Sequence, residues 1–538
     1  MDAVEVDDRS GAMLSVGRGT IVMALATVVS LFFNFIARVA VARGYSVAAW
    51  GEFSLGVALA GLLSIVAVMG LPQAVARALA YEHDPDRRRR IIRTGLAITG
   101  ITSVAASALV FLFSPELAHL FSGGAAPATS GGLTLVFQMF SVTVGFTLMA
   151  NFLAALFQGF EDAGPNAWFN NMVNPGLFVV FVLLFIVLHL GFFGALLAYT
   201  LASASAFVGI AIFTAVRFHR NLERPFARST ASLPSNFYPL TLALWGVTSL
   251  AFLTLFVDTL ILGVFWPPTI VGEYSSQTIL ARLVLVVNSA LLFIYLPVSA
   301  RLVRANDFQS LRWTFATSTR WVLGIAIPLL LLFVFLPDES LTAVFGAKYA
   351  TGQVALSILV IGSFLSVAVG PVTSCLSGLA ATRVLLWSSL ASMLTNVILS
   401  LVLIPPYGLL GAAIAWSVAR VLYPSLGAIV LSREWAISTW KRSVVLPTVL
   451  AFVIGAPLFA IVNLFHPVYW LVYPLYFVGV GIFILAVLAT RSLDAGDLIF
   501  ARSIENALNV KLSTVERLIQ RFTEDTPQPL PSDGPGPP

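Results

Sequence analysis

The chain has 538 residues, of which 58% are hydrophobic and only 10% are charged, and its mean hydropathy is +0.93. This composition excludes a soluble globular protein, because a transmembrane helix needs about 20 apolar residues and the chain offers fourteen such stretches. The net charge of +5 does not indicate nucleic-acid binding, since the arginines lie at the borders of the apolar stretches, where anionic lipid headgroups attract them. We therefore predict an all-α polytopic membrane protein.

The predicted elements follow one another with short connections. Residues 1–18 are a polar segment that we expect to be cytoplasmic, and we expect no cleavable signal because the first apolar run is long enough to span. The predicted spans are 19–42, 49–73, 92–114, 131–157, 168–189, 192–216, 238–264, 272–299, 315–336, 350–374, 384–404, 408–431, 444–464 and 468–490. Apolar residues recur every three or four positions in 491–525, which predicts an amphipathic cytoplasmic helix, and the proline-rich 526–538 is predicted to be a disordered tail.

Arginine is distributed unevenly among the connections. Those after the second, sixth, eighth and twelfth spans are rich in it, whereas the connections on the other side offer only Arg43 and Lys348. Because basic connections resist translocation, the basic side is predicted to be cytoplasmic, with both termini inside.

Short motifs repeat between the first six spans and the next six. Trp50-Gly51-Glu52-Phe53 opens the second span and Val271-Gly272-Glu273-Tyr274 opens the eighth, and four such matches lie 217 to 225 residues apart. Such motifs arise readily by chance in apolar sequence, but four in the same order favour duplication. The pattern predicts two six-helix halves, 19–228 and 229–432, related by a pseudo-two-fold axis along the membrane normal, with spans 13 and 14 (433–490) outside the repeat.

Four ionisable residues lie inside predicted spans, where a charge is costly and by default marks function. They are Arg38, Asp258, Arg282 and Arg420, and the first two occupy equivalent places 220 residues apart. A guanidinium group matches phosphate or carboxylate geometry and stays charged. These residues predict a cationic cavity between the two halves that faces an anionic solute.

Structural alternatives stay open for each of these residues. Arg38 could snorkel to the outer surface, it could form a purely structural ion pair with Asp258, and Arg420 could bind a helix carbonyl or a headgroup. Amides within spans often join helices to one another, so only Asn34 and Asn174 are assigned to the cavity. No metal or cofactor is predicted, because the five histidines are scattered and Cys375 is the single cysteine.

Several motifs of the first hundred residues resemble one known family. Gly19-Thr20 opens the first span, and Phe35-Ile36-Ala37-Arg38-Val39-Ala40-Val41-Ala42-Arg43-Gly44 and Gly70-Leu71-Pro72-Gln73-Ala74 follow. Trp50-Gly51-Glu52-Phe53 departs mildly from the Tyr-Gly-x-Phe of that family. Together they resemble the polysaccharide flippases of the multidrug/oligosaccharidyl-lipid/polysaccharide exporter superfamily. The resemblance implies a transporter, not an enzyme, in the plasma membrane of a prokaryote, with Arg38 and Arg282 lining its cavity.

The predicted function is to flip a lipid-linked oligosaccharide, a polyprenyl phosphate or pyrophosphate sugar, from the inner to the outer leaflet by alternating access. The predicted partners are this glycan and membrane lipids, a coupling ion is left open, and the chain is expected to be a monomer. One alternative is a multidrug or organic-ion exporter of the same superfamily, whose cavity should be acidic or aromatic. Another is a membrane glycosyltransferase or polymerase, which would need acidic residues in a sizeable outer loop.

Overall fold

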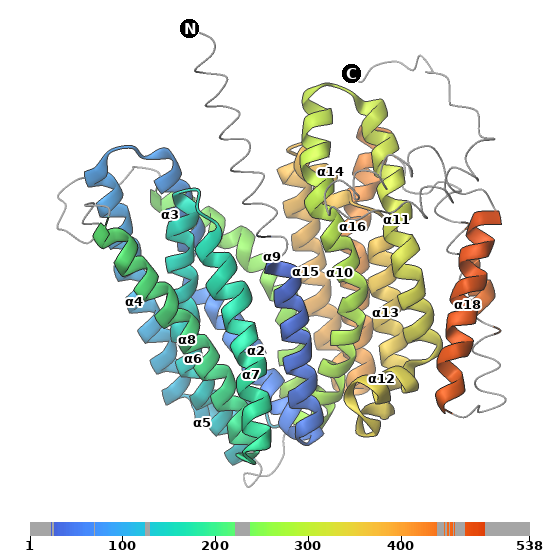
Figure 1. Cartoon of the computed structure of the whole chain (residues 1–538), viewed down its shortest axis with the longest axis horizontal. Helices are drawn as coiled ribbons and strands as arrows, with labels where there is room; N and C mark the ends of the chain where they lie inside the picture. The colour runs from blue at the N-terminus through green and yellow to red at the C-terminus, as the bar shows by residue number, and fades with distance from the viewer. Residues whose placement is uncertain are drawn as a thin grey trace. The chain divides into compact units, whose positions relative to one another are not determined.

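The structure is a computed structural model that describes residues 26–68, 70–123, 130–220, 237–437 and 469–489, together with residue 23 and some positions between 446 and 457. Within these ranges the regular structure is entirely helical (Figure 1). The predicted segments 1–18, 491–525 and 526–538 lie outside the described residues, as does most of the thirteenth predicted span.

Ten of the described helices are long and apolar enough to cross a membrane, which confirms the prediction of an all-α polytopic membrane protein. The main helices, which include these ten spans, are the first one, Ala26–Gly44, then α2 (Val47–Val68), α4 (Pro85–Leu112), α6 (Ser130–Gly159), α7 (Asn174–Val187), α8 (Gly191–Arg220), α9 (Phe237–Phe265), α10 (Pro268–Arg304), α11 (Phe308–Phe335), α13 (Gln353–Ala368), α15 (Thr382–Tyr407), α16 (Leu409–Glu434) and α18 (Tyr469–Ala489). The short elements between them are α3 (Leu71–Tyr81), α5 (Ser114–Leu120), the π-helical turn η2 (Asn166–Val173), α12 (Pro337–Phe345), the 3₁₀ turn η3 (Ala347–Gly352) and α14 (Val372–Gly378).

The second predicted span does not run unbroken to its expected end. Gly70 has φ of 70°, and α3 begins after it at Leu71, with Pro72 in its first turn. Glycine adopts this left-handed conformation at little cost, and proline favours the first turn of a helix. The predicted second span is therefore interrupted at Gly70, and α3 begins after it as a separate short helix.

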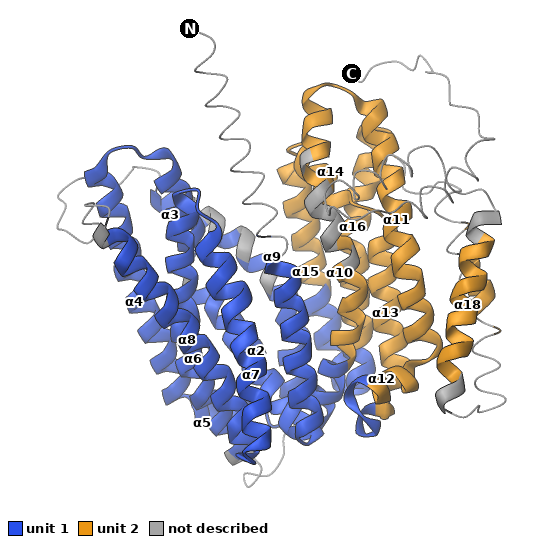
Figure 2. Cartoon of the chain, in the orientation of Figure 1, with its two compact units in different colours: residues 1–276, 344–349, 396–412 blue, residues 277–343, 350–395, 413–538 orange. Residues whose placement is uncertain are grey.

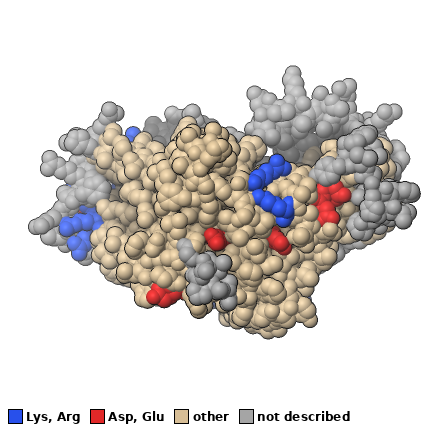
Figure 3. Space-filling view, turned by 90° about the horizontal axis from the view of Figure 1, so that it is seen from below, with Lys and Arg blue, Asp and Glu red and all other residues tan. Residues whose placement is uncertain are grey.

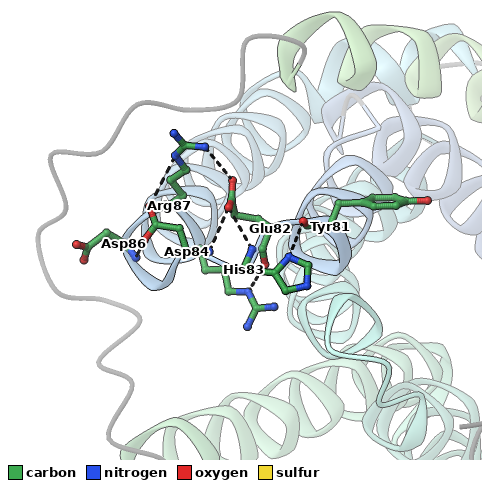
Figure 4. A network of polar contacts seen from close by, with 7 residues as sticks. Tyr81, Glu82, His83, Asp84, Asp86 and Arg87 are labelled. Atoms are coloured by element: carbon green, nitrogen blue, oxygen red, sulfur yellow. Dashed lines mark hydrogen bonds and ion pairs between the residues drawn. The ribbon is translucent and has the colours of Figure 1, made fainter. Parts of the chain in front are cut away.

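The turn from α3 to α4 is fixed by a small polar network (Figure 4). The side chain of Asp84 accepts a hydrogen bond from Asp86 N at 3.0 Å and caps the start of α4. Arg87 lies 3.7 Å from carboxylate oxygens of both Glu82 and Asp84. Exposed ion pairs stabilise little, so the main effect of this network is to position the arginine-rich first turns of α4.

The chain divides into two compact units (Figure 2). Unit 1 comprises residues 1–276, 344–349 and 396–412, and unit 2 comprises residues 277–343, 350–395 and 413–538. These bounds differ from those of the predicted halves, 19–228 and 229–432, and the division into those halves stays a prediction.

The core of unit 1 is built from helix faces that bury aromatic and aliphatic side chains. One cluster joins α3, α4, α6 and α8 around the buried Leu79, Ile92, Phe152 and Ile210. A second cluster stacks Phe53 parallel to Phe178, with 6.0 Å between ring centroids, and sets Tyr199 edge-on to both rings. Such offset and edge-on arrangements suit the quadrupole of aromatic rings. These clusters pack α6 and α8 against the neighbouring helices of unit 1.

Unit 2 has a separate core. Tyr295, Leu311, Phe315, Leu376 and Leu431 are buried together, and they bring α10, α11, α14 and α16 into contact. The last described helix, α18, joins this unit through the hydroxyl of Tyr476, which donates to the carbonyl of Pro328 at 3.0 Å. That carbonyl lies within α11, which contains Pro328 in its interior.

Equivalent glycines of the repeat meet in unit 1. A Cβ atom on Gly51 of α2 would lie 1.7 Å from the carbonyl oxygen of Pro268, and one on Gly272 of α10 would lie 2.2 Å from that of Val47. Val47 and Pro268, like Gly51 and Gly272, are 221 residues apart (268 − 47 and 272 − 51). Each glycine therefore approaches the carbonyl that lies four residues before the other glycine. Such a reciprocal contact is expected of two helices related by a two-fold axis.

A segment from the middle of the chain caps the end of the first helix. Arg43 Nε donates to the carbonyl of Val344 at 2.7 Å, Lys348 Nζ donates to the carbonyl of Arg43 at 3.2 Å, and the hydroxyl of Tyr349 donates to that of Ala42 at 3.0 Å. The last carbonyls of a helix lack partners within it and attract cations. The two cations of the predicted outer connections, Arg43 and Lys348, thus lie together at one helix end.

Figure 3 shows a face on which charged atoms form only small, separate groups where described residues are visible.

Candidate functional site

Unit 1 contains a cavity of about 480 Å³. Its walls come from the first helix, α2, α3, α6, η2, α8 and α9. Arg38 is the one charged residue among the described residues that line it. The other polar and aromatic lining residues are Ser64, Gln73, Thr143, Thr147, Asn151, Gln158, Asn166, Tyr199 and Phe256.

Helix α6 supplies a polar stripe to this cavity, interrupted by Ala154 and Ala155. Thr143, Thr147, Asn151 and Gln158 all line it, and their spacings of four, four and seven residues place them on one helix face. The stripe covers about 22 Å along the axis at 1.5 Å per residue. Thr143 is buried, whereas Asn151 and Gln158 are exposed. The cavity therefore has a polar wall that water reaches at the end of α6 nearer Gly159.

Arg38 and Tyr199 lie in the same part of the molecule. Both line the cavity, and Arg38 is near enough to Tyr199 for an electrostatic interaction. Arg38 is half-buried, so its charge is only partly solvated. Near them the hydroxyls of Thr143 and Thr200 are 3.0 Å apart and join α6 to α8. A partly desolvated guanidinium beside neutral polar groups is suited to bind an anion.

The π-helical turn η2 contributes asparagines at the side of the cavity. Asn170 Nδ2 donates to Asn166 Oδ1 at 2.9 Å and to Asn151 Oδ1 at 3.4 Å. Asn151 and Asn166 both line the cavity. Single π turns are rare and are often found at functional sites, because the wider turn redirects side chains. Here the turn brings two lining asparagines from different elements into one hydrogen-bonded group.

Unit 2 holds the two other arginines that the sequence singles out. Arg282 of α10 and Arg420 of α16 are both half-buried and are near enough for their charges to repel each other. The guanidinium of Arg420 lies over the Trp416 ring, 5.8 Å from its centroid. A cation–π contact of this kind offsets part of the repulsion. The structure thus brings Arg282 and Arg420 together within one unit.

The remaining predicted site residues do not line the cavity of unit 1. Asp258 is fully buried and accepts a hydrogen bond from the hydroxyl of Tyr274. Asn34 Nδ2 donates to the carbonyl of Ser30 in its own helix at 2.9 Å, and Asn174 begins α7 directly after the π turn. Roles in substrate binding for these three residues, and an ion pair between Arg38 and Asp258, stay predictions.

Sequence reasoning missed most of the neutral lining residues, among them Gln73, Asn151, Gln158 and Tyr199. An isolated amide in an apolar helix is weak evidence for a site, because such residues often join helices. The usable signal was the recurrence of polar residues at 143, 147, 151 and 158 on one face. Only the packed structure shows that this face borders a cavity rather than another helix.

The chain is similar to several proteins of known sequence. The chain is 25% identical over 393 residues to an uncharacterised membrane protein of Methanocaldococcus jannaschii, which covers 70% of this chain and 88% of that protein. It is 23% identical over 452 residues to the stage V sporulation protein B of Bacillus subtilis, covering 78% and 84%. The lipid II flippase MurJ of Bacillus subtilis is 24% identical over 202 residues, which is 36% of either chain.

Solved structures share the fold. An inward closed conformation of the lipid II flippase MurJ has a TM-score of 0.64 at 14% identity and covers 86% of this chain and 98% of its own. An inward-facing multidrug resistance MATE family transporter of the MOP superfamily has a TM-score of 0.62 at 16% identity, with 77% and 98% covered. They are named as a flippase and a transporter, and at these identities the likeness to them concerns the fold.

The family itself follows from the sequence match. The profile of the polysaccharide biosynthesis protein family matches residues 16–303, which is 288 of 538 positions (303 − 16 + 1) and more than half of the chain. The match includes the spans whose motifs resemble the polysaccharide flippases, and it confirms that resemblance. The chain belongs to the polysaccharide biosynthesis protein family.

Proposed function

We propose that this protein flips a lipid-linked oligosaccharide, carried on polyprenyl phosphate or pyrophosphate, from the inner to the outer leaflet by alternating access. The observation that carries the proposal is the lining of the cavity in unit 1. It combines one guanidinium with neutral hydroxyl and amide groups, and no carboxylate is among the described residues that line it. Such a site favours an anionic, hydroxyl-rich headgroup. The family membership and the flippase relatives support the same substrate class.

The physics of the substrate fits such a protein. The phosphate headgroup cannot cross hydrocarbon unaided, whereas the polyprenyl tail has no need to leave it. Arg38 would replace part of the water around the phosphate, and a role for Arg282 in binding the substrate stays a prediction. With the cell interior negative, outward movement of an anion releases about 2.3 kcal/mol per charge per 100 mV. The membrane potential is therefore a sufficient driving force for the outward step. The proposed location is the plasma membrane of a prokaryote, with both termini in the cytoplasm.

An organic-cation exporter of the same fold is the competing function. The likeness to the MATE family transporter concerns the fold and does not choose between the two. A cavity for cations needs a carboxylate or an electron-rich aromatic cage. Arg38 repels cations, and this favours the anionic substrate.

The test is flipping in proteoliposomes of a fluorescent polyprenyl pyrophosphate disaccharide, measured as its loss of accessibility to an impermeant quencher. Arg38→Ala should reduce the initial rate at least about tenfold, because a charge-assisted hydrogen bond is worth about 1.5–3 kcal/mol. Arg38→Lys should retain an intermediate rate, since an ammonium keeps the charge but loses the fork of donors.

The matched control is Arg433→Gln, which removes an exposed arginine of α16 and should leave the rate at the wild-type level. Equal rates for wild type and Arg38→Ala would contradict the proposal. The proposal would also be contradicted if the wild-type protein transported a lipophilic cation and did not flip the lipid.

A further inference from the structure

Four carboxamides are among the described residues that line the cavity of unit 1 together with Arg38. Gln73, Asn151, Gln158 and Asn166 come from α3, α6 and η2. Amides that merely join helices are expected to be buried between them. Three of these four, Gln73, Asn151 and Gln158, are instead exposed while lining the cavity. Their position therefore calls for a polar ligand or water in the cavity, and not for a neighbouring helix.

Hydrogen bonds hold part of this group in place. Asn170 is itself not a lining residue, yet it donates to the Oδ1 atoms of both Asn151 and Asn166. These bonds engage the Oδ1 acceptors of Asn151 and Asn166. The π turn sets Asn166 and Asn170 one turn apart on η2. Rotamers fixed in this way lose little freedom when a ligand binds.

The chemistry of this group matches one kind of ligand. A carboxamide both donates and accepts hydrogen bonds, as a sugar hydroxyl does, and it carries no charge. The stripe on α6 from Thr143 to Gln158 measures about 22 Å at 1.5 Å per residue, which is long enough for several linked sugars. We infer that the carboxamides of α6, α3 and η2 form the subsite that recognises the glycan, distinct from Arg38, which holds the phosphate. This inference rests on the proposed function.

The experiment compares two lipids in proteoliposomes. One is a fluorescent polyprenyl pyrophosphate trisaccharide of neutral sugars, and the other is the same polyprenyl pyrophosphate without sugar. The readout is the ratio of their initial flipping rates. Wild type should favour the trisaccharide. Asn151→Ala combined with Gln158→Ala should lower the ratio about tenfold, because two neutral hydrogen bonds are lost. Asn170→Ala should lower it less, since that residue acts by positioning Asn151 and Asn166.

The matched control is Gln138→Ala, which removes a carboxamide from the same helix that does not line the cavity and should keep the wild-type ratio. An unchanged ratio in the double variant would overturn the inference, as would a wild type without preference for the trisaccharide. A double variant slowed equally for both lipids would assign these residues to structure alone. Failure of the proposed function would give a different result. Arg38→Ala would then flip both lipids at the wild-type rate, or the wild-type protein would flip neither lipid. In the second case the inferred glycan subsite would also be rejected.

Discussion

Single charged residues in apolar helices carried the most functional information. Arg38 stood out in the sequence because a charge within a span is costly, and the structure finds it lining a cavity. Asn151 and Gln158 line the same cavity but gave no comparable signal, since an amide costs little and occurs widely between helices. The surroundings of Asp258 were equally hidden, because its partner Tyr274 lies one helix further along the chain.

Replacing that partner is expected to destabilise the protein. In Tyr274→Phe the buried carboxylate of Asp258 loses a donor, and a buried acceptor without this bond costs about 1–3 kcal/mol. Purified Tyr274→Phe in detergent should therefore unfold at a lower temperature than wild type. Tyr238→Phe, which removes the hydroxyl of an exposed tyrosine, is the control and should unfold like wild type. Equal unfolding temperatures for Tyr274→Phe and wild type would show that this hydrogen bond contributes nothing.

At the scale of elements, long apolar runs were sufficient to predict the long helices among the described residues, but not short ones such as α5 and α12. The break at Gly70 and the π turn at Asn166–Val173 were not predicted. Each depends on local backbone geometry and on side chains from other helices. The repeat of Gly51 and Gly272 was visible in the sequence, but the reason for it was not. Both glycines are needed because α2 and α10 approach through their backbones.

This close approach should not tolerate a methyl group. In Gly51→Ala the new Cβ would lie 1.7 Å from the carbonyl oxygen of Pro268, so the helices must separate. Overpacking of this kind costs about 1–3 kcal/mol or more, and a lower unfolding temperature and reduced yield of folded protein are expected. Gly100→Ala is the matched control within a span, because no described atom lies within 4 Å of the place its methyl group would take. Stability of Gly51→Ala equal to that of Gly100→Ala would rule out the tight crossing.

At the scale of the whole molecule, charge bias predicts orientation and repetition predicts halves. The bias places both termini and the turn between α3 and α4 in the cytoplasm, and this orientation stays a prediction. The bounds of the compact units differ from those of the predicted halves, because 229–276, 344–349 and 396–412 belong to unit 1, and the division into halves stays a prediction. Sequence could not foresee this, since the hydrogen bonds of Arg43 and Tyr349 join residues about three hundred positions apart.

Orientation can be tested with an impermeant thiol reagent on intact cells. The native Cys375 is fully buried and should give little background. Ala347→Cys, at an exposed position of η3, should be labelled from outside. Tyr81→Cys, at the exposed end of α3, should be labelled only after the cells are opened. Labelling of Tyr81→Cys on intact cells would contradict the proposed orientation and indicate the opposite one.

The paired glycines also bear on how such a chain arose. A six-helix ancestor that associated with a parallel copy of itself would have used one glycine on both sides of the contact. The predicted duplication would have turned that single codon into two, now Gly51 and Gly272, which would inherit the same constraint yet mutate separately. Each now depends on the backbone of the other copy. Homologues should therefore keep a small residue at both positions, and a change at either should be accompanied by a shift in the partner helix.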